Sequence, residues 1–375
     1  MREKIEEARK VGEAETNSGV SFSGKDGKPR EEDWLRIGHR MIKGQSSSLF
    51  MMELEDVLKT LSEDELLTAL KDVSGLPLEW NTRNFLISRL VQQLAKTNPE
   101  AAIVWLMDSK QEDRAPFSSE LFSRWLQSDP QRALEWYDRK LADGAFDTKM
   151  LSGRNVMRAG FEGNVIAHLF KSDPAAIADR LRDLPAGMRV DALRDVDVPK
   201  AGATERRFYV QLLRDFLSEK EVKDEMGRIA FGLFSGDDSR YARISEFLTQ
   251  VQATPEEREG AVAMLWTAVG DYVRRRGEAP VEALSGLRSW MEHETPSSVD
   301  RITGRAIFSL LNGNEMETGE AVAFIQSCLQ KGADPDILIG GCIDGIASKD
   351  RDAARALAEK ITNPERRATI LNQLK

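Results

Sequence analysis

Capping residues placed directly before prolines recur along this chain and constrain its fold more than any other feature. In such a pair the Asn, Asp or Thr oxygen accepts a hydrogen bond from an unpaired N–H of the first helical turn. The proline loses only an N–H that had no partner, and its fixed φ suits a helix start. Each pair therefore predicts the beginning of a helix. The pairs are Asn98-Pro99, Asp129-Pro130, Asp173-Pro174, Thr254-Pro255, Thr295-Pro296, Asp334-Pro335 and Asn363-Pro364.

The apolar residues between these starts recur at helical spacing. Ser62-Glu63-Asp64-Glu65 and Ser218-Glu219-Lys220-Glu221 add two capping boxes. Strand-like alternation is confined to short isolated runs such as 196–198, which are too few to build a sheet. We therefore expect an all-α chain whose short loops make successive helices antiparallel. One clear stripe contains Val262, Leu265, Trp266, Val269, Tyr272 and Val273.

The first 33 residues differ in character from the rest. Residues 1–14 predict a short charged helix with Ile5, Ala8 and Val11 as its apolar stripe. Residues 15–33 are rich in Gly, Ser, Lys and Asp and predict a flexible arm, because they cannot bury enough apolar area to offset their ordering entropy. We expect a helical-repeat region over 34–375, with a soft division near 196–203.

Three of the helix starts share a longer pattern. In each, one helix ends in apolar residues, an Asn or Asp cap follows, and the next helix opens with small alanines that let two helices approach closely. A degenerate fourth copy, 346–357, has Arg351 in place of the proline. The three copies are Leu94–Trp105 (LAKTNPEAAIVW), Trp125–Trp136 (WLQSDPQRALEW) and Leu169–Arg180 (LFKSDPAAIADR).

This unit resembles the divergent helical repeats of verrucomicrobial and planctomycete proteins, in which W-x-x-x-D-P-x-x-A-x-x-W segments recur. It is more loosely similar to TPR and HEAT solenoids. The resemblance is best over 47–190 and departs from TPR proper, because the Trp–Leu–Gly–Tyr consensus does not fall in one 34-residue frame. It implies an α-α superhelix that serves as a scaffold, and it assigns no chemistry.

Charge and composition narrow the classes of partner. Acidic residues number 62 and basic residues 53, which gives a net charge of −9 and disfavours nucleic acid. The longest apolar runs are too short to span a membrane. Many of the similar proteins begin with a signal or lipoprotein anchor, whereas the first residues here have no apolar stretch and do not predict one. We expect a protein partner and a cytoplasmic location, or a periplasmic one if a signal or anchor was removed.

The residues that most often carry chemistry do not form a recognisable site. His39, His168 and His293 have no ligand at a metal-binding spacing, and His293 suits the last turn of a helix. Cys328 and Cys342 fall on apolar stripes and lack a nearby histidine. We therefore predict no catalytic, cofactor-binding or metal-binding residue, and no cofactor.

Other polar and small residues have structural interpretations. Gly341 and Gly345 predict points of close approach between helices. Asp237-Asp238 predicts a helix start, and Arg274-Arg275-Arg276 predicts a helix end, where each charge favours the dipole.

Two function classes remain from the sequence. The first is a non-enzymatic scaffold built as a right-handed solenoid, with Trp105, Trp125 and Trp136 packed inside their repeats. The alternative is an α/α-toroid-like enzyme that acts on polysaccharide through paired carboxylates brought together by folding. A third class, HEAT-like nucleic-acid binding, is disfavoured by the charge.

Overall fold

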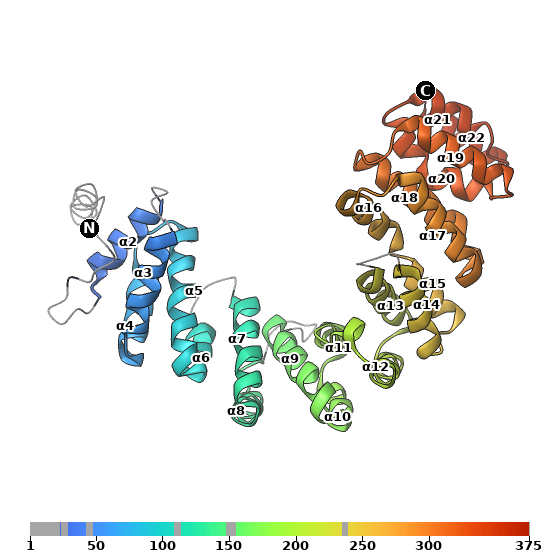
Figure 1. Ribbon diagram of the computed structural model, residues 1–375. Coiled ribbons are helices and arrows are strands. Elements are labelled where there is room, and N and C mark those ends of the chain that lie inside the picture. The colour runs from blue at the N-terminus through green and yellow to red at the C-terminus, as the bar shows by residue number, and fades with distance from the viewer. Residues whose placement is uncertain are drawn as a thin grey trace. The chain divides into compact units, whose positions relative to one another are not determined.

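The computed structural model describes residues 23, 29–42, 48–108, 114–147, 155–234 and 239–374. Over these residues the chain consists of helices and their connections, without a strand (Figure 1). The predicted all-α fold is therefore confirmed. The predicted helix over 1–14, most of the arm over 15–33, and Asp237-Asp238 lie outside the described residues.

The chain forms two compact units. Unit 1 comprises Met1–Ser172 with Asp191–Asp195, and unit 2 comprises Asp173–Val190 with Val196–Lys375. In unit 1 the helix α4 packs on α5, α5 packs on α6, and α7 packs on both α8 and α9. The helices of unit 1 are α2 (Glu31–Ile42), α3 (Ser48–Lys59), α4 (Glu63–Gly75), α5 (Trp80–Thr97), α6 (Pro99–Asp108), α7 (Arg114–Ser128), α8 (Pro130–Ala142) and α9 (Val156–Ser172).

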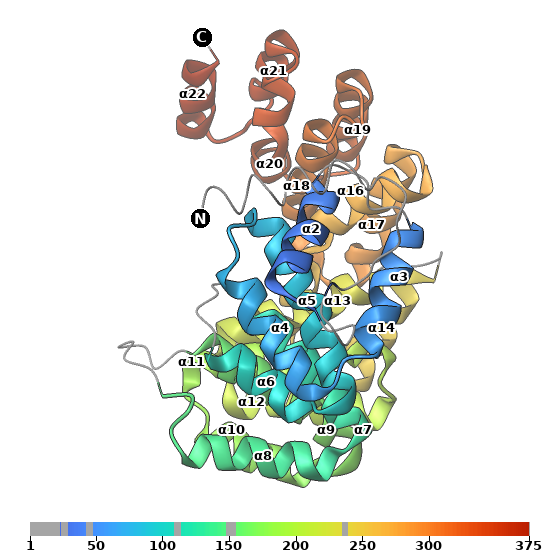
Figure 2. The ribbon, with the colours of Figure 1, turned by 90° about the vertical axis from the view of Figure 1, so that its left-hand side faces the viewer.

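Unit 2 contains the remaining helices, and α11 crosses the boundary between the units. Figure 2 shows α20, α21 and α22 following one another towards the C-terminus. The helices are α10 (Ala175–Asp183), α11 (Ala186–Leu193), α12 (Ala203–Phe216), α13 (Glu219–Phe234), α14 (Arg240–Gln250), α15 (Pro255–Val262), α16 (Leu265–Arg276), α17 (Pro280–Glu294), α18 (Val299–Asn312), α19 (Thr318–Gln330), α20 (Pro335–Ala347), α21 (Arg351–Ala358) and α22 (Pro364–Gln373).

Most helices of unit 2 fall into two layers. One layer contains α13, α15, α16, α18 and α20, each in contact with the next along the chain. The other contains α12, α14, α17 and α19, again in order. Alternate helices thus stack on one another, which is how a two-helix repeat builds a solenoid.

Glycines bring the helices of the first layer together. A Cβ added to Gly304 of α18 would lie 2.6 Å from the Leu338 carbonyl oxygen and 3.0 Å from the Gly341 Cα of α20. A Cβ on Gly227 of α13 would lie 2.9 Å from the Gly260 carbonyl oxygen of α15. At Gly345 it would meet the Phe308 ring at 3.1 Å. The predicted close approaches at Gly341 and Gly345 are confirmed.

Hydrogen bonds between repeats give the period of the stack. Asp334 N–H donates to Asp300, 34 residues before it, and Arg214 donates to Glu257, 43 residues after it. The Ser245 hydroxyl donates to Glu294, 49 residues on. These separations suit a two-helix repeat. The α-α superhelix is supported in this way, while its handedness stays a prediction.

Most predicted caps are present. The Asp129 side chain accepts from the Arg132 N–H at 3.3 Å, as expected, and Asn98 accepts from the Ala101 N–H at 3.0 Å. Thr254 forms a capping box with Glu257. Side-chain caps are also made by Asp334, Asn363 and Asp350, and capping boxes by Ser62 and Ser218.

Two predicted caps are wrong. At Asp173 the backbone carbonyl, rather than the carboxylate, accepts from the Ala176 N–H, and α10 begins one residue later than expected, so that Pro174 takes the cap position. At Thr295 the chain enters a 3₁₀ turn over Pro296–Ser298 before α18. The Thr295 hydroxyl is buried there without a hydrogen-bond partner. In both cases a short tight turn replaces the α-helical first turn that a side-chain cap requires.

Candidate functional site

Unit 1 has an aromatic cluster where α7, α8 and α9 meet. Phe122 stacks on Phe161 with ring centroids 4.7 Å apart, and Trp125 lies 5.6 Å from Trp136. Trp125 and Trp136 are 3% and 1% exposed, so their predicted packing role is confirmed. Trp105 is half-buried on α6, and its packing role stays a prediction. Tyr137 and Phe146 complete the cluster.

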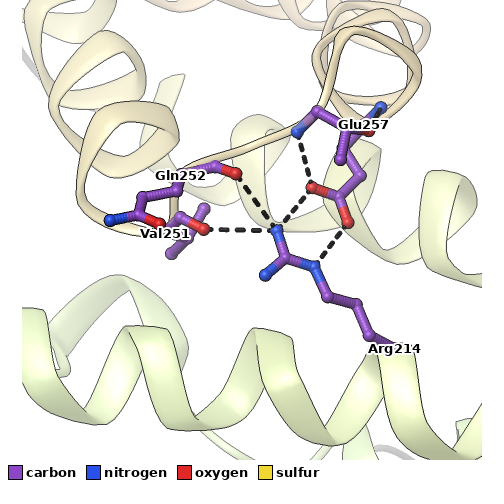
Figure 3. Close-up of polar contacts among 5 residues, drawn as sticks. Arg214, Val251, Gln252 and Glu257 are labelled. Atoms are coloured by element: carbon purple, nitrogen blue, oxygen red, sulfur yellow. Dashed lines mark hydrogen bonds and ion pairs between the residues drawn. The ribbon is translucent and has the colours of Figure 1, made fainter.

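Unit 2 contains a polar contact in which one arginine joins three helices (Figure 3). Arg214 of α12 donates from Nε and Nη2 to the two carboxylate oxygens of Glu257 on α15, both at 2.8 Å. Its Nη2 also donates to the carbonyls of Val251 and Gln252, at 3.2 and 3.3 Å, where α14 ends. One guanidinium thus supplies hydrogen bonds both to a buried carboxylate and to carbonyls at the end of α14, which have no partner within the helix.

The protonation of this contact follows from its surroundings. Burial alone would raise the pKa of Glu257, but the Arg214 guanidinium and the Thr254 N–H hold that pKa below its usual value. The pKa of Arg214 is raised in turn by its hydrogen bonds to Glu257. The pair is therefore charged over the neutral range and acts as a fixed brace between helices.

Further arginine–carboxylate pairs in unit 2 link a helix to another helix or to a connection between helices. Sequence reasoning missed them, because a charge partner 12 to 41 residues away has no meaning until the packing of the helices is known. They are Arg240–Glu278 (3.0 Å), Arg274–Glu315 (2.7 Å), Arg288–Asp300 (2.7 Å) and the very short Arg258–Glu294.

Arg240 is the most enclosed of these arginines, with 5% of its surface exposed. Its guanidinium lies over the rings of Tyr272, Tyr241 and Phe234, at 4.0, 4.9 and 5.5 Å from their centroids. Burial raises the pKa of Tyr241 to about 12, so that phenol stays neutral. An aromatic cage that could take a cationic ligand is thus already filled by a cation of the chain itself.

The histidines and cysteines are placed as the sequence predicted. His293 lies in the last turn of α17, where its Nδ1 contacts the Ser289 carbonyl at 3.0 Å. His39 and His168 are half-buried on α2 and α9. Cys328 and Cys342 are buried, and burial raises the pKa of the Cys342 thiol to about 12, which makes it a poor nucleophile.

The alternative enzyme needs two carboxylates that folding brings together, and the buried carboxylates are the candidates for such a pair. Glu257 is held by Arg214, and Glu225 by Arg228 at 2.6 Å. Asp33 accepts from the backbone of Ser23 and Arg30. These carboxylates therefore serve structural contacts. In the described part of the chain, moreover, no three His, Cys, Asp or Glu side chains are grouped so that they could hold a metal ion.

Two open cavities lie on the surface. One, of about 440 Å³, lies in unit 1 beside the start of α6, with Asn98, Glu100 and Arg132 in its wall. The other, of about 240 Å³, lies in unit 2 between α20 and α22 and has Asp344, Ser348, Arg351 and Gln373 as polar lining. Both are shallow, so they suit contact with a partner's surface better than enclosure of a substrate.

Comparison with known proteins does not assign the chain to a family: no family model, no curated protein and no solved structure matches it. Over the described residues, none of the helices has the length and apolar character needed to cross a bilayer.

Proposed function

We propose that this protein is a non-enzymatic helical-repeat scaffold that binds another protein. The observation that carries the proposal is that charged side chains between the helices pair with one another. Half-buried Arg214 and buried Glu257 join α12 to α15. Buried Arg240 joins α14 to Glu278, in the connection between α16 and α17. Such contacts hold a repeat stack in register and leave its outer surfaces for recognition.

The shape of the available surface points the same way. Stacked repeats present an extended face on which many weak contacts add up, whereas an enzyme needs a concave site with convergent polar groups. The two cavities described above are open, and the hydroxyls that line them, Ser348 and Thr97, donate to the backbone carbonyls of Gly345 and Leu94 and not to a base.

The test is a cross-linking experiment in cells. The tagged full-length chain is treated with a lysine-reactive cross-linker, purified, and its cross-linked peptides are identified by mass spectrometry. We expect one protein to be captured in near-stoichiometric amount, with cross-links on neighbouring repeats. The purified pair should then reassociate in isothermal titration.

The opposite result would be catalysis. The purified chain is incubated with a panel of soluble polysaccharides, and release of reducing ends is measured. Hydrolysis that is lost when one carboxylate is changed to its amide, together with the absence of any reassociating protein, would establish the enzyme instead.

A further inference from the structure

The groove between α20 and α22 is a candidate recognition site. Two arrangements create it: α22 is tied to its neighbours at both ends, and its middle stands away from α20. At its start, Asp336 of α20 accepts from the backbone of Thr362 and Asn363. At its end, Arg355 of α21 donates to the Leu374 carbonyl. The cavity of about 240 Å³ lies between these ties.

Helix α20 forms the floor of the groove, and the first part of this floor consists of two glycines, which have no side chains. Gly340 and Gly341 lie one helical turn before Asp344 on α20. A Cβ on Gly341 would lie 3.4 Å from the Arg305 N of α18, and a Cβ on Gly340 would meet the Arg366 guanidinium of α22. The paired glycines therefore bring α18 and α22 to the two sides of one half-buried strip of α20 backbone.

The charges around this strip are mainly positive. Arg305, Arg351 and Arg366 are exposed, and no hydrogen bond or close ion pair is seen for their side chains among the described residues. Two carboxylates face them. Asp344 lines the cavity. The pKa of Asp336 is lowered by its hydrogen bonds from Thr362 and Asn363 and, less strongly, by the nearby charge of Arg366. The groove thus keeps a net positive charge on a chain of net charge −9.

Apolar surface lies beside the charge. Ile343 and Ile370 line the cavity. Ile370 is half-buried, and no residue of α22 is fully buried. Guanidinium groups recognise carboxylates through paired hydrogen bonds, and an apolar side chain would fill the space between α20 and α22. Nucleic acid is the weaker match, because no aromatic side chain lines the cavity for base stacking.

We propose that this groove binds an acidic segment of a partner protein, with carboxylates on Arg305, Arg351 and Arg366 and an apolar side chain between α20 and α22. This inference rests on the proposed scaffold function and names the chemistry of its partner.

The test uses the full-length chain and a fluorescein-labelled peptide of four Glu-Glu-Leu repeats, followed by fluorescence anisotropy at about 0.1 M salt. We expect saturable binding. Arg305→Glu and Arg366→Glu should each weaken it by about tenfold or more, the factor that loss of one charge-assisted contact produces. Gly340→Leu should also weaken it without any change of charge, because the new side chain takes the space of the Arg366 guanidinium and displaces it.

The matched control is Arg275→Glu. Arg275 is an exposed arginine at the end of α16, outside the groove, and no hydrogen bond or ion pair is seen for it among the described residues. We expect this variant to bind within about twofold of wild type, since a distant exposed charge is largely screened. Circular dichroism of each variant checks that the fold is retained.

Three results would overturn the inference. The first is the absence of peptide binding, and the second is an equal loss in Arg275→Glu. The third is tighter binding of a single-stranded RNA of matched length, with the same dependence on Arg305 and Arg366. If one of these results is obtained while the cross-linking experiment still captures a protein through other repeats, the groove assignment fails and the scaffold function stands.

Discussion

Unit 1 and unit 2 are both stacks of helices with apolar cores, and they differ in the contacts that are most prominent between their helices. In unit 1 the rings of Phe122, Trp125, Trp136 and Phe161 lie against one another and exclude water. In unit 2 guanidinium–carboxylate pairs and glycine contacts join successive repeats. Burial of aromatic area is insensitive to pH and, unlike surface charge, to screening by salt. We therefore expect the two units to respond differently to solution conditions.

The largest expected effect is in unit 1. Trp125→Ala removes a buried ring from the cluster and should lower the free energy of unfolding by about 3–5 kcal/mol. Urea denaturation followed by fluorescence and circular dichroism measures it. If the variant unfolds at the wild-type midpoint, the cluster does not stabilise unit 1 and the contrast with unit 2 disappears.

The second largest effect is expected at the glycine contacts between helices of unit 2. In Gly304→Val the new side chain meets the backbone of α20, which cannot move aside, so a loss of about 3 kcal/mol is expected, at the upper end of overpacking costs. Gly319→Ala in α19 is the control, because a Cβ there meets nothing within 4 Å. Its midpoint should stay the same or rise slightly. An equal loss in both variants would show that the effect of Gly304→Val does not come from the close approach of α18 and α20.

The ionic contacts should respond to pH. The pKa of Glu257 is lowered in the folded chain, so the pair with Arg214 stabilises unit 2 above the ordinary glutamate pKa. That stability is lost as the pH falls through the lowered pKa. Glu257→Gln should cost about 2 kcal/mol at neutral pH and flatten the acid dependence.

Hydrogen exchange at pH 7 and pH 4 locates this loss. Exchange rates are compared as protection factors, each taken relative to the intrinsic exchange rate at the same pH. We expect lower protection around α12, α14 and α15 at the lower pH, with the protection of α7 to α9 unchanged. An equal loss of protection in both units would show that the pair does not distinguish them.

The smallest effect concerns the caps. Asp129→Ala leaves an unpaired N–H at the start of α8 and should cost about 1 kcal/mol, felt first around residues 118–143. Exchange beyond Thr254 should stay slow, because each repeat is held by its neighbours. Asp173→Ala should cost less, since its side chain does not cap α10. If exchange accelerates uniformly, the chain unfolds as one cooperative body.

Local rules predicted local structure well. The Asn and Asp caps were found from pairs of adjacent residues, and Trp125 and Trp136 from helical spacing, because these signals lie within one or two turns. Asp173 and Thr295 failed as caps because a tight turn, which depends on the following packing, replaced the first α-helical turn.

The contacts between repeats were beyond sequence reasoning. Arg214 and Glu257 are 43 residues apart, and each resembles an ordinary surface charge until the repeats are aligned. The groove at Arg305 and Arg366 was likewise missed, since its residues come from three helices. Gly341 was found because a glycine inside a helical pattern needs a packing reason, and Gly304 opposite it could have been found by the same rule.

The glycines of the first layer in unit 2 also bear on how the chain folds during synthesis. A glycine inside a helix costs about 1 kcal/mol relative to alanine, and helices of this length are marginal alone in water. Helix α18 contains Gly304 and should therefore gain little structure until α20, with Gly341, has been made. We expect unit 2 to consolidate in steps of one repeat, each helix of the tight layer becoming stable only after its partner has left the ribosome.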